Sequence, residues 1–221
     1  MQKVAIMVDG GFFVKRLYSE LGYLEADTAA KFLMKYCLSH LKSKGKNEES
    51  KTLYRIFYYD CLPSGKKVFN PITRKTVDLS KTELYSWMHN FINTLRSQRK
   101  VALRLGKLSD AHAGYYLSVD TTKKLIQGRI EELEEKHLQL KVEQKGVDMK
   151  LGIDVASLVL KKQVDQIILI SGDSDFVPAA KLARREGIDF VLDPLWAHVS
   201  PDLFEHIDGM KSHHFNQIKL N

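Results

Sequence analysis

The chain has 221 residues, of which 44% are hydrophobic and 28% are charged. These values are typical of a globular domain and argue against a disordered, collagen-like or coiled-coil protein. Basic residues exceed acidic residues by 34 to 27, and the net charge of +7 favours polyanionic partners, although a solvated surface explains it equally well. No apolar run approaches the roughly 18 to 20 residues that span a bilayer, and the two cysteines have no paired spacing. We therefore expect a cytoplasmic protein with no membrane segment.

The first half of the chain alternates between strand and helix patterns. Residues 4–8 are continuously apolar and end at Asp9-Gly10-Gly11, which is typical of a buried parallel strand followed by a tight turn. Apolar residues at three- and four-residue spacing then predict helices over residues 27–42 and 80–98. Residues rich in β-formers predict strands over 53–59 and 101–105.

The second half of the chain begins with a weak pattern and then becomes regular. The weak region, at about 107–140, is interpreted as an insertion or arm within one domain of residues 1–221. The regular elements that follow are a helix over 148–162, a strand over 167–170, a helix ending at Arg185 and a strand over 189–192. Four histidines after residue 197 match no zinc spacing, and we expect an exposed tail there. Alternating strands and helices predict a mostly parallel sheet covered on both faces.

Aspartates follow two of the predicted strands. Asp9 ends the first strand, Asp173 follows the strand over 167–170, and Asp175 comes two residues later. The carboxyl ends of parallel strands converge, so we expect these side chains to meet in one cleft. Crowded carboxylates raise each other's pKa unless a cation neutralises them, and Mg²⁺ or Mn²⁺ prefers such oxygen ligands. The alternative that these aspartates are turn and helix-cap residues is left open.

Three short motifs occur along the chain: Val8-Asp9-Gly10-Gly11, Gln144-Lys145-Gly146-Val147-Asp148, and Ser171-Gly172-Asp173-Ser174-Asp175-Phe176-Val177-Pro178. In this order, and with Asp154 between the last two, they resemble the NYN domain of LabA-like bacterial proteins, a branch of the PIN-like nucleases. The resemblance implies an α/β, PIN-like three-layer fold with a mostly parallel central sheet of order 3-2-1-4-5. It also implies an Mg²⁺- or Mn²⁺-dependent ribonuclease that hydrolyses RNA phosphodiesters.

The resemblance also implies which residues form the site. The catalytic and metal-binding cluster would comprise Asp9, Asp148, Asp173 and Asp175, with Asp154 as a further metal ligand. Asp148 and Asp154 are six residues apart and do not share a helix face, so one of them is a candidate for a structural role. Lys145, Ser171 and Ser174 are candidates for substrate contacts, although a solvated lysine and local caps explain them too.

Phe12 departs from the family pattern, in which Asn often stands three residues after the first Asp. The departure motivates an alternative, a catalytically degenerate module that binds RNA or a protein and regulates without cleavage. A phosphatase of the haloacid-dehalogenase type is less favoured because Gly11 stands where its second aspartate would be. We expect a nuclease acting on single-stranded RNA and leave homo-oligomerisation open.

Overall fold

The computed structural model describes residues 1–42 and 49–219, with only the backbone described for 109–112 and 143–144. The chain forms two compact units. The larger consists of Met1–Asp60, Asn90–Gly106 and Gly146–Asn221, and the smaller of Cys61–His89 and Lys107–Lys145.

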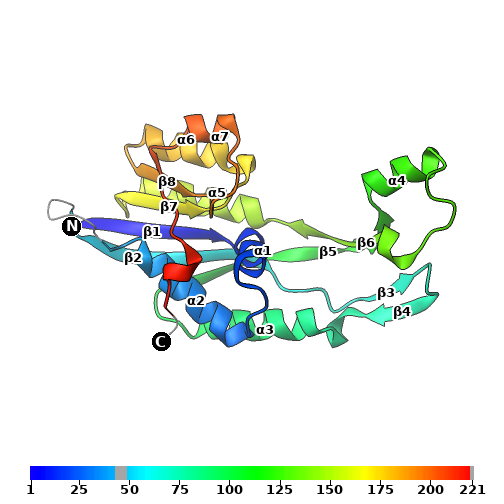
Figure 1. Cartoon of the computed structure of the whole chain (residues 1–221). Helices are drawn as coiled ribbons and strands as arrows, with labels where there is room; N and C mark the ends of the chain where they lie inside the picture. The colour runs from blue at the N-terminus through cyan, green and yellow to red at the C-terminus, as the bar shows by residue number, and fades with distance from the viewer. Residues whose placement is uncertain (43–48, 220–221) are drawn as a thin grey trace. The chain divides into compact units, whose positions relative to one another are not determined.

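A mostly parallel sheet forms the centre of the larger unit (Figure 1). Its strand order is β5-β2-β1-β7-β8-β9, in which β2, β1, β7, β8 and β9 are parallel to their neighbours within that group. Strand β6 continues the order beyond β5 and belongs to the smaller unit. The bounds are β1 (Gln2–Asp9), β2 (Lys51–Cys61), β5 (Val101–Leu117), β6 (Leu138–Lys145), β7 (Gln166–Ile170), β8 (Asp189–Asp193) and β9 (Gly209–Met210). When β1, β2, β5, β7 and β8 are numbered 1 to 5 along the chain, their order in the sheet is 3-2-1-4-5, which confirms the prediction.

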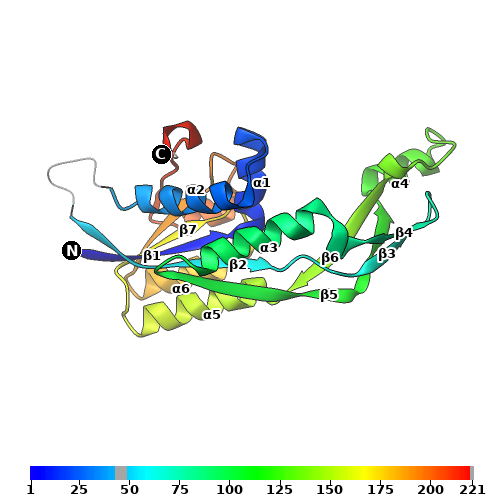
Figure 2. The ribbon, with the colours of Figure 1, turned by 90° about the horizontal axis from the view of Figure 1, so that it is seen from below.

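Helices cover both faces of this sheet, which confirms the α/β class and gives three layers. Helices α1 and α2 lie on one face, and α5 and α6 lie on the other (Figure 2). The bounds are α1 (Gly10–Leu21), α2 (Ala26–Ser39), α3 (Glu83–Arg96), α5 (Val147–Leu160), α6 (Val177–Arg185) and α7 (Pro201–Glu205).

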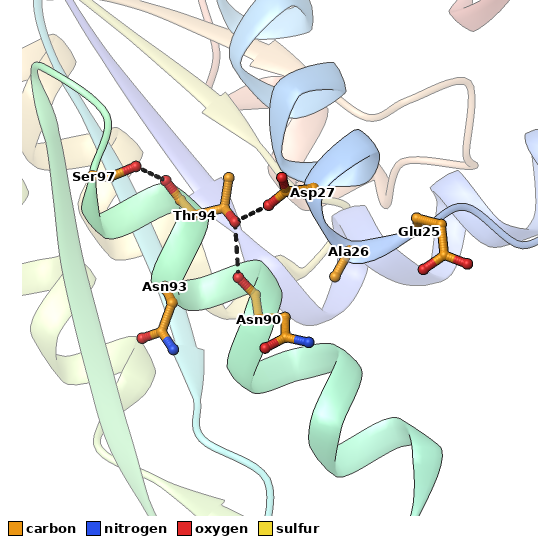
Figure 3. A pocket seen from close by; sticks show the side chains of 7 residues that line it. All are labelled: Glu25, Ala26, Asp27, Asn90, Asn93, Thr94 and Ser97. Atoms are coloured by element: carbon orange, nitrogen blue, oxygen red, sulfur yellow. Dashed lines mark hydrogen bonds between the residues drawn. The ribbon is translucent and has the colours of Figure 1, made fainter.

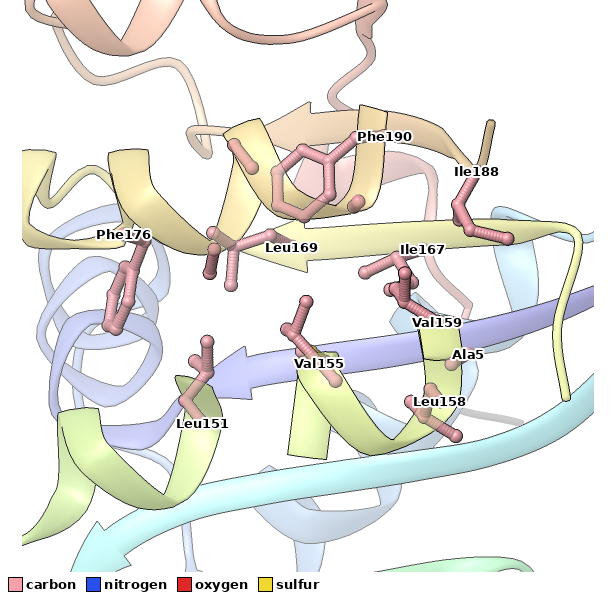
Figure 4. Close-up of a cluster of buried hydrophobic side chains, with 14 of the residues drawn as sticks. Ala5, Leu151, Val155, Leu158, Val159, Ile167, Leu169, Phe176, Ile188 and Phe190 are labelled. Atoms are coloured by element: carbon pink, nitrogen blue, oxygen red, sulfur yellow. The ribbon is translucent and has the colours of Figure 1, made fainter. Parts of the chain in front are cut away.

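The main hydrophobic core lies between the sheet and helices α5 and α6 (Figure 4). Leu151 and Val155 of α5 pack with Leu169 of β7 and Phe190 of β8, and all four side chains are fully buried. The predicted apolar run of residues 4–8 is also fully buried, as expected for a central strand covered on both sides. This packing fixes the strand ends at which the acidic residues lie.

Helix α1 was not predicted from the sequence. Gly10 and Gly11 were interpreted as a tight turn, but they begin a helix whose N-cap is Asp9. A Cβ atom at Gly10 would lie 2.4 Å from the Tyr58 ring and 2.5 Å from the Asp60 carboxylate. Only glycine fits there, because the first turn of α1 passes against the end of β2.

The prediction of an exposed C-terminal tail is wrong. Strand β9 pairs with β8, and the 3₁₀ helix η4 (Phe215–Gln217) places the buried Phe215 ring against Phe13, Phe32 and Tyr36. Burial of this aromatic ring holds the last described segment onto the larger unit.

The smaller unit contains regular structure in the region that was predicted to be an insertion. Its elements are the hairpin β3 (Lys67–Asn70) and β4 (Lys75–Asp78), the outer part of β5, α4 (Val119–Ile126), the 3₁₀ helix η2 (Glu135–His137) and β6. The outer part of β5 pairs with β6 in antiparallel orientation. Buried Asn70 donates a hydrogen bond to Glu135 at 2.9 Å, which ties the hairpin to η2.

Candidate active site

Four neighbouring parallel strands carry an aspartate at or just after their carboxyl ends. Asp9 is the last residue of β1, Asp193 is the last of β8, and Asp60 is the last but one of β2. Asp173 follows β7 by three residues. This edge of a parallel sheet is where ligands bind in open α/β folds.

Asp9 is held by two hydrogen bonds from different elements. Its Oδ1 accepts from the backbone N–H of Phe12 at 3.1 Å, and its Oδ2 accepts from the Ser171 hydroxyl at 3.0 Å. Burial raises the pKa of Asp9, and the negative charges of Asp173 and Asp148 raise it further. Asp9 is therefore fixed in position and electrostatically coupled to residues from two other elements.

The turn after β7 relays contacts from Asp9 to the neighbouring carboxylates. The fully buried Ser171 hydroxyl donates to Asp9 and accepts from the backbone N–H of Asp173 at 3.2 Å. Asp173 Oδ1 in turn accepts from the N–H of Asp175 at 3.0 Å and caps the 3₁₀ helix η3 (Ser174–Phe176). Asp173 and Asp175 are both exposed, so the turn presents two carboxylates to solvent.

Asp148 joins this group from the first turn of α5. Gly146, whose φ is 79°, precedes the helix in the left-handed conformation and directs the chain into it. Partial burial raises the pKa of Asp148, and the charges of Asp173 and Asp175 add to the effect. The structure therefore brings together Asp9, Asp148, Asp173 and Asp175 as one electrostatic group, called the acidic site below.

Asp154 has a different environment, although it lies on the same helix as Asp148. Its Oδ2 accepts from Arg104 Nε at 2.6 Å and from the Tyr59 hydroxyl at 2.9 Å. These contacts neutralise its charge and point it toward β5 and β2. Of Asp148 and Asp154, both on α5, Asp154 is therefore the one whose contacts indicate a structural role.

The remaining predicted residues lie at or outside the acidic site. Ser171 is part of it, through its bond to Asp9. Ser174 is exposed within η3, next to Asp173 and Asp175. Lys145 is exposed at the end of β6, in the smaller unit.

Phe12 is the residue that departs from the pattern implied by the resemblance. Its backbone N–H supports Asp9, and its ring lies against Gly172, where an added Cβ would come within 3.1 Å of the ring. The side chain therefore packs on the turn after β7 and offers that turn no polar group.

Two residues beside the acidic site were not predicted as part of it. The buried Tyr58 hydroxyl donates to Asp60 at 2.8 Å, and burial raises the pKa of Tyr58 well above its usual value, with added effects of Asp60 and Asp9. Asp60 could have been found by the signal that identified Asp9, an aspartate at the end of an apolar strand. It adds another carboxylate next to β1.

The acidic site offers the type of donor atom that a divalent cation prefers. In the described part of the chain, no three acidic, histidine or cysteine side chains are already arranged to hold one metal ion. The donors present are hard oxygen ligands. Burial raises the pKa values of Asp9 and Asp148, and neighbouring carboxylate charges add to the effect, so a cation would favour the ionised forms. Mg²⁺ retains several waters and binds through only one or two carboxylates in many sites.

Two surface hollows in the larger unit have other linings. One, of about 450 Å³, lies between the start of α2 and the second half of α3 (Figure 3) and contains the contact from the Thr94 hydroxyl to Asp27. The other, of about 390 Å³, lies between β5 and α5 and is lined in part by Arg104, Lys150 and Asp154. Neither is lined by the four aspartates of the acidic site.

The fold and the acidic site define an α/β protein with coupled carboxylates at the carboxyl edge of a parallel sheet. The family model of the NYN domain matches residues 88–203, just over half of the chain. The chain therefore belongs to the NYN domain family, within the PIN-like nuclease superfamily. The matched region includes Asp148, Asp173 and Asp175, whereas Asp9 precedes it.

Comparison with other proteins adds little beyond the family. A crystal structure of a protein of unknown function from Vibrio parahaemolyticus is similar, with 14% sequence identity and a TM-score of 0.47, over 95% of this chain and 91% of that chain. No curated protein matches the chain significantly. Among the helices described, none has the length and apolar character needed to cross a membrane.

Proposed function

We propose that this chain is a metal-dependent ribonuclease that hydrolyses phosphodiester bonds of single-stranded RNA at the acidic site. The observation that carries the proposal is the electrostatic coupling of four carboxylates, from β1, α5 and the turn after β7, in a member of a nuclease superfamily. Coupled carboxylates at a strand-end edge favour a cation, and a cation favours a phosphate-bearing substrate. The net charge of +7 favours the same class of substrate.

The proposal assigns roles to the aspartates of the acidic site and to Ser171. Asp9 and Asp173 would be the main ligands of Mg²⁺ or Mn²⁺, and Asp148 and Asp175 would hold the metal or its water. A cation bound there would help to generate a nucleophile from water at neutral pH and would offset negative charge on the phosphoryl group. Ser171 is a positioning residue, because its hydroxyl donates a hydrogen bond to Asp9 and accepts one from the backbone N–H of Asp173.

The proposal also covers the branch of the NYN family to which the chain belongs and its division into domains. We place the chain in the LabA-like branch, acting in the cytoplasm as one NYN domain of residues 1–221. The region at about 107–140 would be an inserted arm of that domain. The range of the NYN match, residues 88–203, extends on both sides of this region, which supports a single domain.

A second candidate is a regulatory module that binds RNA or protein without cleaving. The observation that favours it is Phe12, whose ring packs on Gly172 and leaves no side-chain amide to orient water or substrate there. The two candidates differ in turnover, and a cleavage assay separates them.

The test is cleavage of end-labelled single-stranded RNA and DNA by the purified chain with Mn²⁺, Mg²⁺ or EDTA. The proposal predicts metal-dependent cutting of RNA that falls at least about a hundredfold in Asp173→Asn, because a lost ligand removes several kcal/mol of transition-state stabilisation. Asp202→Asn, which removes an exposed carboxylate from α7, is the matched control and should cut normally. RNA binding without cutting in any metal would replace the nuclease by the regulatory module.

A further inference from the structure

The segment after β8 has a backbone conformation that bulky residues rarely adopt. Leu195 and Trp196 have φ values of 48° and 64°, both in the left-handed region that favours glycine. Trp196 nevertheless exposes 58% of its surface, so burial of the ring does not compensate for the strain. Strained residues of this kind persist where surrounding contacts enforce them, and they concentrate at binding and catalytic sites.

Contacts from two parts of the chain, residues 193–194 and Arg16, enforce this conformation. The Leu195 N–H donates to Asp193 Oδ1 at 2.9 Å, and its carbonyl accepts from Arg16 Nη2 and Nε at 2.9 and 3.2 Å. The Ala197 N–H donates to the Pro194 carbonyl at 2.8 Å. Asp193 is itself fully buried, and its other partners are Tyr36, His40 and Ser212. The loop is therefore anchored to a rigid support.

The exposed indole is oriented as firmly as its backbone. Trp196 Nε1 donates to the His213 carbonyl at 3.3 Å, and the indole stacks on the exposed His214 ring with centroids 4.4 Å apart and planes 14° from parallel. The result is a two-ring stack, fixed in direction and open to solvent. An aromatic surface that is ordered before binding loses little conformational entropy when a flat ligand stacks on it.

The segments that support this stack contact elements that carry the acidic site. Asp193 pairs in register with Ile170, the residue before Ser171, and the Ser171 N–H donates to the Asp193 carbonyl at 3.2 Å. Arg16, which clamps Leu195, lies on the helix that Asp9 caps. Two chain connections therefore join the stack to the strand ends where the carboxylates lie.

We propose that Trp196 and His214 form a stacking platform for a nucleobase of single-stranded RNA whose backbone reaches the acidic site. The inference rests on the proposed ribonuclease function and names how that function holds its substrate. Every nucleobase has a π-face, so stacking gives binding that tolerates any sequence. Residues 209–219 contain two lysines and two histidines but no acidic residue, which suits a polyanion.

The test measures, by fluorescence anisotropy, the binding of labelled single-stranded RNA to the full chain in EDTA. Stacking on one aromatic side chain predicts about ten- to a hundredfold weaker binding for Trp196→Ala and a change of only a few fold for Trp196→Phe. An oligonucleotide with the same phosphates and an abasic tract should bind both wild type and Trp196→Ala equally weakly. Phe204→Ala, which removes a 59% exposed ring from α7, is the control and should bind as wild type does.

A second readout separates stacking from a structural role. The chain has two tryptophans, so Trp87→Phe leaves Trp196 as the only indole, and RNA should quench its fluorescence, whereas the abasic oligonucleotide should not. Wild-type affinity in Trp196→Ala, or equal affinity of wild type for normal and abasic RNA, would overturn the platform. Equal loss in the Ala and Phe variants together with lowered thermal stability would also overturn it.

The outcomes also distinguish this inference from the nuclease proposal. Binding that depends on Trp196, in a chain that cuts RNA with no metal, keeps the platform and rejects the nuclease. Metal-dependent cutting, with wild-type RNA affinity in Trp196→Ala, keeps the nuclease and rejects the platform. Capture of a protein partner through Trp196 with no RNA affinity rejects the platform as well.

Discussion

Asp9 and Asp193 occupy equivalent positions at the ends of parallel strands, separated by β7, yet their surroundings are opposite. Asp193 is fully buried and accepts hydrogen bonds from Tyr36, Ser212 and the backbone of Leu195, with His40 Nε2 at 2.9 Å. Asp9 is partly exposed, and its neighbours include further carboxylates. One aspartate is satisfied by the fold, and the other is left with unbalanced negative charge.

The comparison teaches that the position of an aspartate at a strand end does not define its role. The decisive difference is the sign of the surrounding charges and the number of donors. Asp148 and Asp154 repeat this contrast on a single helix, since Asp154 is paired with Arg104 and Asp148 faces other carboxylates. A carboxylate whose charge is not balanced by its neighbours lowers the stability of the fold. Such perturbed groups are common at functional sites.

The largest effect is expected from Asp193→Ala. The substitution removes the carboxylate that is shared by the buried Tyr36 and His40 and the partly buried Ser212. Breaking such a network costs about 3–5 kcal/mol. The measurement is the free energy of unfolding from urea denaturation followed by circular dichroism. A loss of less than about 1 kcal/mol would contradict the structural role assigned to Asp193.

An intermediate effect is expected from Asp154→Asn. The substitution weakens a partly buried ion pair with Arg104 and the hydrogen bond from Tyr59, and we expect a loss of about 1–2 kcal/mol of stability. RNA cleavage should stay within a few fold of wild type once the protein is folded, whereas Asp148→Asn should lose cleavage without this loss of stability. If Asp154→Asn abolished cleavage at full stability, Asp154 would belong to the acidic site.

The central elements could be predicted from local sequence patterns. The apolar run of residues 4–8 and the alternation of strands and helices were sufficient for the α/β class, because periodicity reports which faces are buried. Asp9, Asp148, Asp173 and Asp175 could be proposed from their positions and from the family resemblance. Their electrostatic coupling is a property of the folded chain.

Other features depend on contacts between distant residues and have no local signal. Helix α1 was missed because Gly10-Gly11 is a usual turn pair, and the reason for Gly10 is its approach to Tyr58, 48 positions later in the numbering. The burial of Asp193 depends on Tyr36 and His40, more than 150 residues earlier. The left-handed Trp196 could not be expected, since propensity disfavours a bulky residue there.

The smallest expected change in stability is an increase, unlike the losses expected for Asp193→Ala and Asp154→Asn. Asp9→Asn should stabilise the fold at neutral pH, because burial and neighbouring charges raise the pKa of Asp9 and make its ionised form unfavourable. A group with a raised folded pKa contributes its stability below the unfolded value of about 3.9 and loses it as pH rises through the folded value.

Asp9→Asn should therefore be more stable than wild type at pH 7 in EDTA, and this difference should vanish below about pH 4. Thermal unfolding across this pH range measures it, and Asn retains the helix cap so that the comparison isolates the charge. Mg²⁺ should reverse the order, since only wild type gains from binding the cation. A variant that is less stable than wild type at pH 7 in EDTA would show that Asp9, like Asp193, is satisfied by the fold.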